Sequence, residues 1–103
     1  MLSAKRVYPR YSYTMNKEQF LQLLSLDRFP EPLEVVQIPN GHLDNHDHPF
    51  EVKALVTEGS IEIVIDGVSR IFNPGDVFQL SYEQVHSESY GPQGVKYLAS
   101  RKQ

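Results

Sequence analysis

The segment HDHPFE, residues 46–51, decides how the chain is interpreted. Its histidines, His46 and His48, are two positions apart, so on a strand both imidazoles leave from one face and can clamp a metal ion. An isolated pair of this kind is weak evidence, because a surface strand can carry two histidines by chance. The segment therefore predicts a metal site only if other parts of the chain complete it.

The composition is that of an ordinary globular protein. The chain has 103 residues and a mass of 11.8 kDa, with 40% hydrophobic and 22% charged residues, which predicts a single domain over 1–103. A net charge of −3 disfavours nucleic acid and anionic lipid as partners. Cysteine is absent, so any metal must use nitrogen and oxygen ligands. No apolar run reaches the ~20 residues of a membrane span and no signal-peptide core is present, so we expect a cytoplasmic protein without membrane contact.

The pattern of elements predicts an all-β barrel preceded by one short helix. Asn16 caps a helix expected over 17–26, with Gln19 completing a capping box, and the prolines of residues 29–32 end it. Asp66-Gly67 is a strong hairpin signal. Branched and alternating runs between turn residues predict strands at 33–38, 52–57, 61–65, 69–72, 77–80 and 95–99. We therefore expect an N-terminal segment over 1–32 and a barrel over about 33–101.

Two motifs carry a resemblance to a known family. The run HDHPFEVKALVTEG, residues 46–59, resembles the first cupin motif, in which HxH is followed by a glutamate and later by a glycine. The run NPGDVFQLSYEQVH, residues 73–86, resembles the second motif, with its PGD turn and later histidine. Together they cover about residues 41–90, and the chain is similar to short single-domain cupins with a helix before the barrel. The resemblance implies a double-stranded β-helix, or jelly roll, in which His46, His48 and His86 bind one divalent transition-metal ion, whether Zn, Fe, Ni, Mn or Cu.

One position departs from the family pattern. Counted back from residues 58–59, the family's glutamate position is filled by Val52. If alternate residues from 46 to 52 share one strand face, Val52 lines the cavity while Glu51 and Lys53 face outward. Glu51 can join the histidines only if Pro49 marks a bulge that shifts the alternation. Because the unbulged register gives the cleaner apolar face, we expect Glu51 to stay outside the metal shell.

Glu88 is the candidate catalytic residue. On a regular strand, Glu88 and Tyr90 share the face of His86 and lie near the same cavity. Glu88 could then be a ligand through water, an acid or base, or a partner that orients an imidazole. An ordinary exposed glutamate at the barrel mouth is the alternative. His42 and Asp44 are expected in the loop before the first motif, with His42 solvated.

The resemblance leaves two classes of function open. A three-histidine shell suits a metal-dependent oxygenase or isomerase that acts on a small molecule. The missing glutamate suits a non-catalytic module that binds or senses a metabolite, and a vestigial, empty site is a third interpretation. We also expect a homodimer, because residues 6–14, with Tyr8, Tyr11 and Tyr13, are suited to add a strand to a partner.

Overall fold

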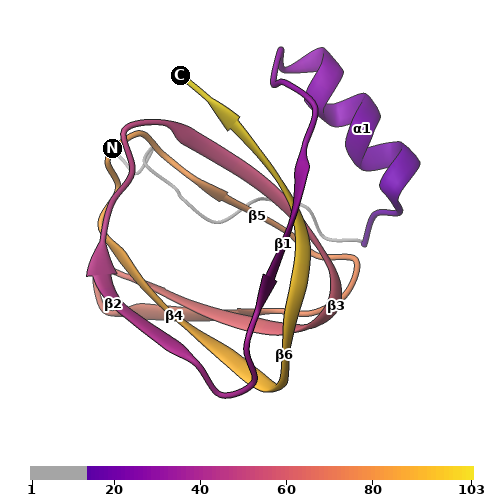
Figure 1. The fold of residues 1–103 in the computed structure, drawn as a ribbon. Coiled ribbons are helices and arrows are strands. Elements are labelled where there is room, and N and C mark those ends of the chain that lie inside the picture. The colour runs from indigo at the N-terminus through magenta and orange to yellow at the C-terminus, as the bar shows by residue number, and fades with distance from the viewer. Residues whose placement is uncertain (1–13) are drawn as a thin grey trace.

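Two long strands organise the fold. The structure is a computed structural model and describes residues 14–103. The elements, in chain order, are α1 (Lys17–Leu26), β1 (Leu33–Gln37), β2 (His42–His46), β3 (Glu51–Ile65), β4 (Val68–Phe72), β5 (Val77–Leu80) and β6 (His86–Lys102). The long strands β3 and β6 pair antiparallel along almost their whole length. The other strands attach to this pair, so every strand contributes to one curved wall (Figure 1).

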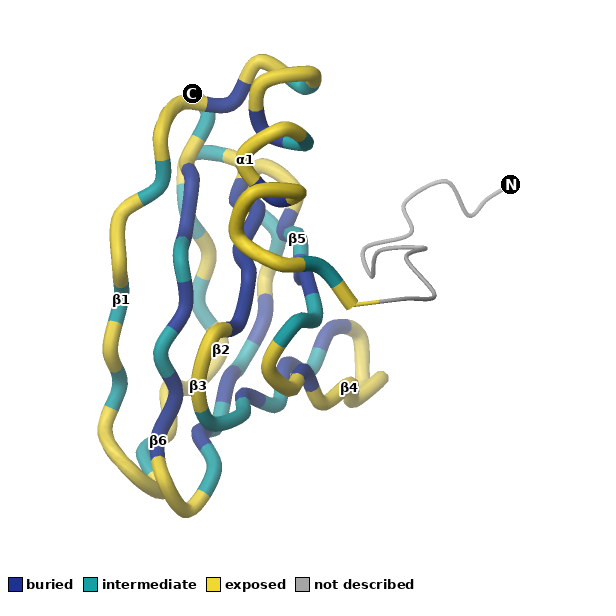
Figure 2. The backbone as a smooth tube through the Cα atoms, turned by 90° about the vertical axis from the view of Figure 1, so that its right-hand side faces the viewer, coloured by how far each residue is buried: buried dark blue, intermediate teal, exposed yellow. Residues whose placement is uncertain are grey.

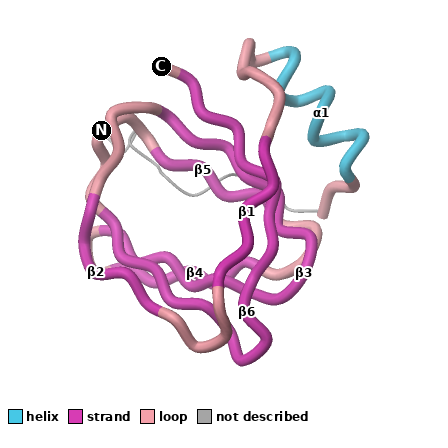
Figure 3. The backbone as a smooth tube through the Cα atoms, in the orientation of Figure 1, coloured by secondary structure: helices cyan, strands magenta, loops and turns pink. Residues whose placement is uncertain are grey.

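Each long strand serves two halves of the barrel. The first half of β3 pairs with β5 and its second half pairs with β4. In the same way, the first half of β6 pairs with β2 and its second half pairs with β1. The change occurs at Gly59, where the register shifts opposite residues 91–94 of β6. Because both long strands bend there, two four-stranded halves face each other as in a double-stranded β-helix. Figure 3 shows that strands make up most of the chain after the helix.

The strands predicted at 33–38, 69–72 and 77–80 correspond to β1, β4 and β5, but the two long strands were not predicted as continuous. The runs predicted separately at 52–57 and 61–65 form the single strand β3. The last strand begins at His86, well before the predicted start at residue 95. His42 and Asp44, predicted in a loop, lie on β2. These errors share one cause: polar segments are held as strands by the pairing of β6 with β2 and β3 rather than by their own composition.

The helix α1 has the predicted bounds and the predicted cap. The Asn16 side chain accepts a hydrogen bond from the Gln19 amide at 2.8 Å, and the Gln19 side chain accepts one from the Asn16 amide at 3.0 Å. Phe20 and Leu24 are buried against Leu55 of β3, on the outside of the barrel. The helix therefore covers part of the outer face of the sheet, leaving β1 mainly exposed in Figure 2.

This cover changes the environment of Lys53, which was expected to face outward from the barrel. Lys53 does point away from the barrel interior, but its exposed fraction is only 8%. It pairs with Asp27 and lies 5.1 Å from the ring centre of Phe29, which follows the helix. The first half of β3 is consequently buried on both faces, with Ala54 and its alternate neighbours in the barrel core.

The expected homodimer and the expected cytoplasmic location remain predictions. Residues 6–13 of the expected partner strand lie outside the described residues. Over residues 14–103, no helix has the length and apolar character needed to cross a bilayer.

Candidate metal centre

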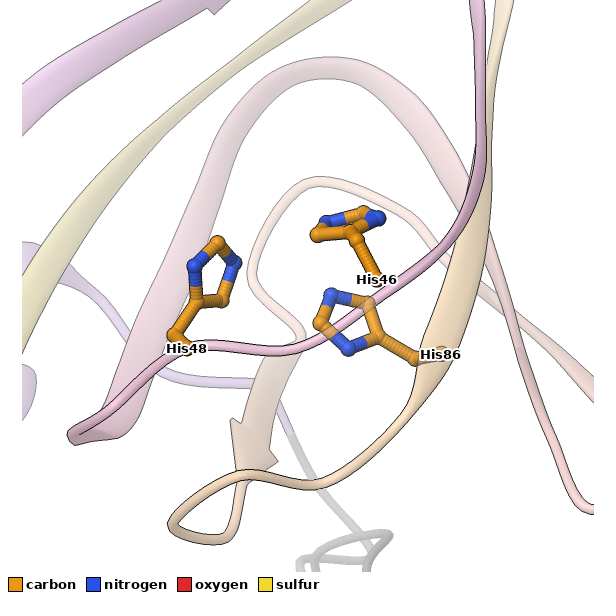
Figure 4. A group of neighbouring side chains, drawn as sticks. All are labelled: His46, His48 and His86. Carbon is orange, nitrogen blue, oxygen red and sulfur yellow. The ribbon is translucent and has the colours of Figure 1, made fainter.

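The three predicted histidines come together at one end of the barrel. His46 ends β2, His48 lies in the connection to β3, and His86 begins β6. Their ring centres are 4.3 Å apart for His46 and His86, 5.0 Å for His46 and His48, and 5.5 Å for His48 and His86. One ring nitrogen from each lies within 4.8 Å of the others, and the rings face one common space (Figure 4). Imidazole nitrogens in this arrangement suit a transition metal.

A bulge in β2 places His46 on the cavity side. Leu43 pairs with Glu88 and His46 pairs with His86, so three steps along β2 match two steps along β6. The extra residue shifts the alternation, so that Leu43 and His46 share a face that a regular strand would give to Leu43 and Asn45. The bulge therefore decides which face His46 occupies, and no continuous strand runs over 46–52.

His48 is positioned by contacts outside the sheet. The chain leaves β2 after His46 and enters β3 only at Glu51. The amide of Glu83 donates a hydrogen bond to the His48 carbonyl at 2.8 Å, which fixes the backbone of this connection. The His48 ring also stacks on Phe50, with ring centres 5.1 Å apart and an interplanar angle of 12°. These two contacts hold His48 toward the other histidines.

Backbone carbonyls set the orientation of two of the imidazoles. Nδ1 of His46 lies 2.7 Å from the Asp44 carbonyl oxygen, and Nδ1 of His86 lies 2.9 Å from that of Gln84. A carbonyl only accepts hydrogen bonds, so each Nδ1 carries the hydrogen, and in the neutral ring the lone pair is on Nε2. This arrangement is typical of metal-binding histidines, which donate their second nitrogen to a carbonyl or carboxylate.

Glu88 lies beside these Nε2 atoms, on the face predicted for it. Its exposed fraction is 7%, and its Oε2 is 3.2 Å from Nε2 of His86 and 3.4 Å from Nε2 of His46. Its Oε1 accepts a hydrogen bond from the Tyr90 hydroxyl at 2.8 Å. The Nε2 lone pairs of His46 and His86 and the Glu88 carboxylate all carry negative charge density, so they repel one another unless a positive charge lies among them. The donor set therefore fits a divalent cation, or a proton shared by His86 and Glu88 in its place.

The pKa shifts describe the proton-bearing form of the site. Burial acts to raise the pKa of Glu88, but its hydrogen bonds with His86 and Tyr90 outweigh burial, so the pKa is lowered. Burial acts to lower the pKa of His86, but the bonds to Glu88 and to the Gln84 carbonyl outweigh it, so the pKa is raised. The pKa of His48 is lowered, first by burial and then by the neighbouring imidazoles. Without metal, these contacts therefore favour the protonated form of His86 and disfavour that of His48.

A pocket of about 150 Å³ opens next to the histidines. It is lined by Val35, Gln37, Leu43, His46, His48, Phe50, Val52, Phe78, Leu80, Glu88, Tyr97, Ala99 and Arg101. Val52 lines the pocket as predicted, whereas Glu51 is exposed, does not line it and pairs across the sheet with Lys102. No shift of alternation at Pro49 brings Glu51 to the histidines, because Pro49 lies outside the strands.

His42 lies on the outer face of the barrel. Its Nδ1 is 2.8 Å from the Ser89 hydroxyl oxygen and its Nε2 is 2.9 Å from the Asp44 carboxylate. The Asp44 side chain is 97% exposed, and none of the three residues lines the pocket. Ser89, His42 and Asp44 are linked in the same order as the serine, histidine and aspartate of a serine hydrolase triad. However, water screens the Asp44 carboxylate and the three side chains adjoin no described pocket, so they do not support nucleophilic catalysis.

Three pocket residues were not predicted from the sequence: Arg101, Tyr97 and Gln37. The predicted last strand ended at Ala99, so Arg101 was not assigned to a face. The alternation of Val95, Tyr97 and Ala99 on the inner face, continued by one step, is the signal that could have identified Arg101.

Solved structures with the same fold share this architecture. A RmlC-like cupin from Shewanella frigidimarina matches with a TM-score of 0.60 and 20% identity, over 69% of this chain and 63% of that chain. A cupin-like protein from Thermotoga maritima matches with a TM-score of 0.61 and 26% identity, over 68% of this chain and 54% of that chain. The polyketide cyclase RemF from Streptomyces resistomycificus matches with a TM-score of 0.58 and 23% identity, over 75% of this chain and 58% of that chain.

In each case the matched region spans less than two thirds of the other chain. No family model matches the sequence, and no curated protein matches it. The bent strand pair and these structural matches together show that the chain is a short cupin-fold protein with a double-stranded β-helix.

Proposed function

We propose that the chain is a metal-binding cupin that takes a small molecule into its barrel. His46, His48 and His86 would hold one divalent transition-metal ion, with Zn, Fe, Ni, Mn and Cu all compatible with imidazole ligands. The observation that carries the proposal is the convergence of three ring nitrogens within 4.8 Å, beside a pocket of about 150 Å³. A bound ion would supply a Lewis acid for an oxygen atom of the small molecule.

The residues around the histidines support a working site. The carbonyls of Asp44 and Gln84 fix two imidazoles, so their Nε2 atoms face Glu88, which lines the pocket. Glu88 supplies the carboxylate that Val52 does not, because its Oε2 is within 3.4 Å of both Nε2 atoms. The same carboxylate lines the pocket, where it can accept a proton from a bound molecule.

We assign the activity to an oxygenase or isomerase class, with Glu88 as the proton-transfer group. A buried carboxylate held by the Tyr90 hydroxyl at one oxygen keeps its orientation while the other oxygen exchanges a proton. The second candidate is a non-catalytic module that binds or senses a metabolite. It is favoured by the apolar Val52 at the family's glutamate position, since a fold alone does not imply an activity.

Elemental analysis of untagged protein tests the proposal. We expect about one transition-metal ion per chain in the parent. Alanine at His46, His48 or His86 should each reduce the metal content strongly, while circular dichroism shows a folded barrel. His42→Ala is the matched control, because this histidine lies on the outer face, and it should retain the metal.

Metal-free parent protein after growth in several metals would refute the metal site. Equal metal loss in the His42→Ala control would also count against it. If metal is bound, turnover of a bound small molecule, with and without oxygen, separates the oxygenase, the isomerase and the binding module. Loss of that turnover in Glu88→Gln with metal retained would assign the proton-transfer role.

A further inference from the structure

The pocket beside the histidines combines an apolar lining with polar groups and one arginine. Its volume of about 150 Å³ is close to that of a cavity that holds benzene, or about six non-hydrogen atoms. Most of the residues that line it are apolar, with Phe50, Val52 and Ala99 among them. Among the described residues that line it, Arg101 is the only lysine or arginine. Such a wall suits a small ligand with an apolar body and one anionic group.

Arg101 is placed on this wall by the alternation of β6. It continues the inner face of Tyr97 and Ala99, and it pairs directly across from Val52 of β3. Its guanidinium carbon lies 5.2 Å from the ring centre of Phe50, and the same ring stacks on His48. Because Arg101 and His48 contact one ring, a ligand of about six atoms can reach both the guanidinium and the histidines.

The guanidinium has no internal anion to bind. Within residues 14–103, no carboxylate forms an ion pair with Arg101. Glu88, the carboxylate on the pocket wall, is already in contact with His86, His46 and the Tyr90 hydroxyl. A guanidinium that stacks on an aromatic ring keeps its N–H edge available, and that edge matches a carboxylate with two parallel hydrogen bonds.

We propose that the pocket binds a small monocarboxylate, whose carboxylate is held by Arg101 and whose apolar body packs against Phe50 and Val52. The proposal rests on the proposed function in one respect, which is that the ligand lies between Arg101 and the histidine group. A divalent ion at the histidines would add to the positive charge of Arg101 and exceed the single charge of Glu88, which further favours an anion.

Acid and amide pairs test this inference. Isothermal titration calorimetry would compare butanoate with butanamide, and 2-hydroxybutanoate with 2-hydroxybutanamide, on the same protein sample. We expect each acid to bind about 5-fold more tightly than its amide, which is the effect of an ion pair with an exposed residue such as Arg101. Arg101→Met should remove most of that difference and leave amide binding unchanged. Lys96→Met is the matched control, because it removes one charge from the outer face of the same strand, and it should bind as the parent does.

The outcomes separate this inference from the metal proposal, since metal content is measured on every sample. If Arg101→Met loses the preference for acids in protein without metal, the role of Arg101 stands and the metal site fails. If metal is present but acids and amides bind equally, or no acid binds, the inference is overturned and the metal site stands. A preference for acids that survives in Arg101→Met also overturns it, because the carboxylate is then held elsewhere.

Discussion

Replacing Glu88 by glutamine in metal-free protein tests the electrostatic description of the site. In the absence of metal, the Glu88 carboxylate faces Nε2 of His86 at 3.2 Å, and both side chains are buried. The amide of glutamine has nearly the same shape but no charge. The hydroxyl of Tyr90 can still donate to its oxygen, so the substitution mainly removes the ionic contact with the imidazolium.

The size of the effect depends on pH in a defined way. The lowered pKa of Glu88 gives stability that is present above its ordinary value of 4.5 and is lost as the pH falls through the folded-state value. The raised pKa of His86 gives stability that is fully present below 6.5 and is lost as the pH rises through its folded-state value. Both contributions are therefore present together between 4.5 and 6.5.

A hydrogen bond between charged groups contributes about 1.5–3 kcal/mol, against about 0.5–1.5 kcal/mol for a neutral one. The difference predicts that Glu88→Gln lowers the free energy of unfolding by about 1 kcal/mol near pH 5.5. Well above the folded-state pKa of His86 the loss should be smaller, or the substitution should stabilise, because a lone pair then faces the carboxylate.

Urea unfolding of chelator-treated protein, followed by circular dichroism, measures this difference when it is carried out at pH 5.5 and at a pH well above the folded-state pKa of His86. Glu51→Gln is the control, because Glu51 is exposed, and its effect should stay within about 0.5 kcal/mol at either pH. If Glu88→Gln costs as much at high pH as near pH 5.5, the ionic contact with His86 does not stabilise the metal-free protein and the reasoning is refuted.

Three further predictions follow from the fold. In metal titrations, Val52→Glu should tighten binding by adding a carboxylate to the pocket wall and Glu51→Gln should bind as the parent does; metal loss in Glu51→Gln alone would contradict the register. Light scattering should report a homodimer at micromolar concentration, since the edge strand β1 exposes Val36, and a monomer mass would count against this. In thermal unfolding, Gly59→Ala should destabilise far more than Gly67→Ala, although both glycines have positive φ. A Cβ at Gly59 would lie 2.0 Å from a backbone oxygen, whereas a Cβ at Gly67 would meet open space, so equal losses of stability would show that the contact at Gly59 relaxes.

Local signals in the sequence were sufficient for some elements. The bounds of α1 follow from a capping box and an apolar stripe, which act within a few residues and need no tertiary partner. The hairpin at Asp66-Gly67 has φ values of 50° and 78°, the left-handed geometry that this pair of residues favours. The resemblance to the cupin motifs named the three histidines and predicted a double-stranded β-helix, and the fold is confirmed.

Tertiary structure decided how the site is assembled. The polar run of β2 becomes a strand only because β6 pairs with it, and the bulge between Leu43 and His46 is visible only in that pairing. Lys53 is buried only because α1 and the segment after it, both distant in sequence, cover the outer face of β3.

Alternation predicted that Glu88 shares a face with His86, but its contact with His46 depends on the bulged register of another strand. Arg101 likewise meets Phe50 on the pocket wall, a contact between residues far apart in sequence. Sequence periodicity assigns a side chain to a face of its own strand, whereas the distance between two side chains depends on long-range pairing and strand curvature, which no local pattern encodes.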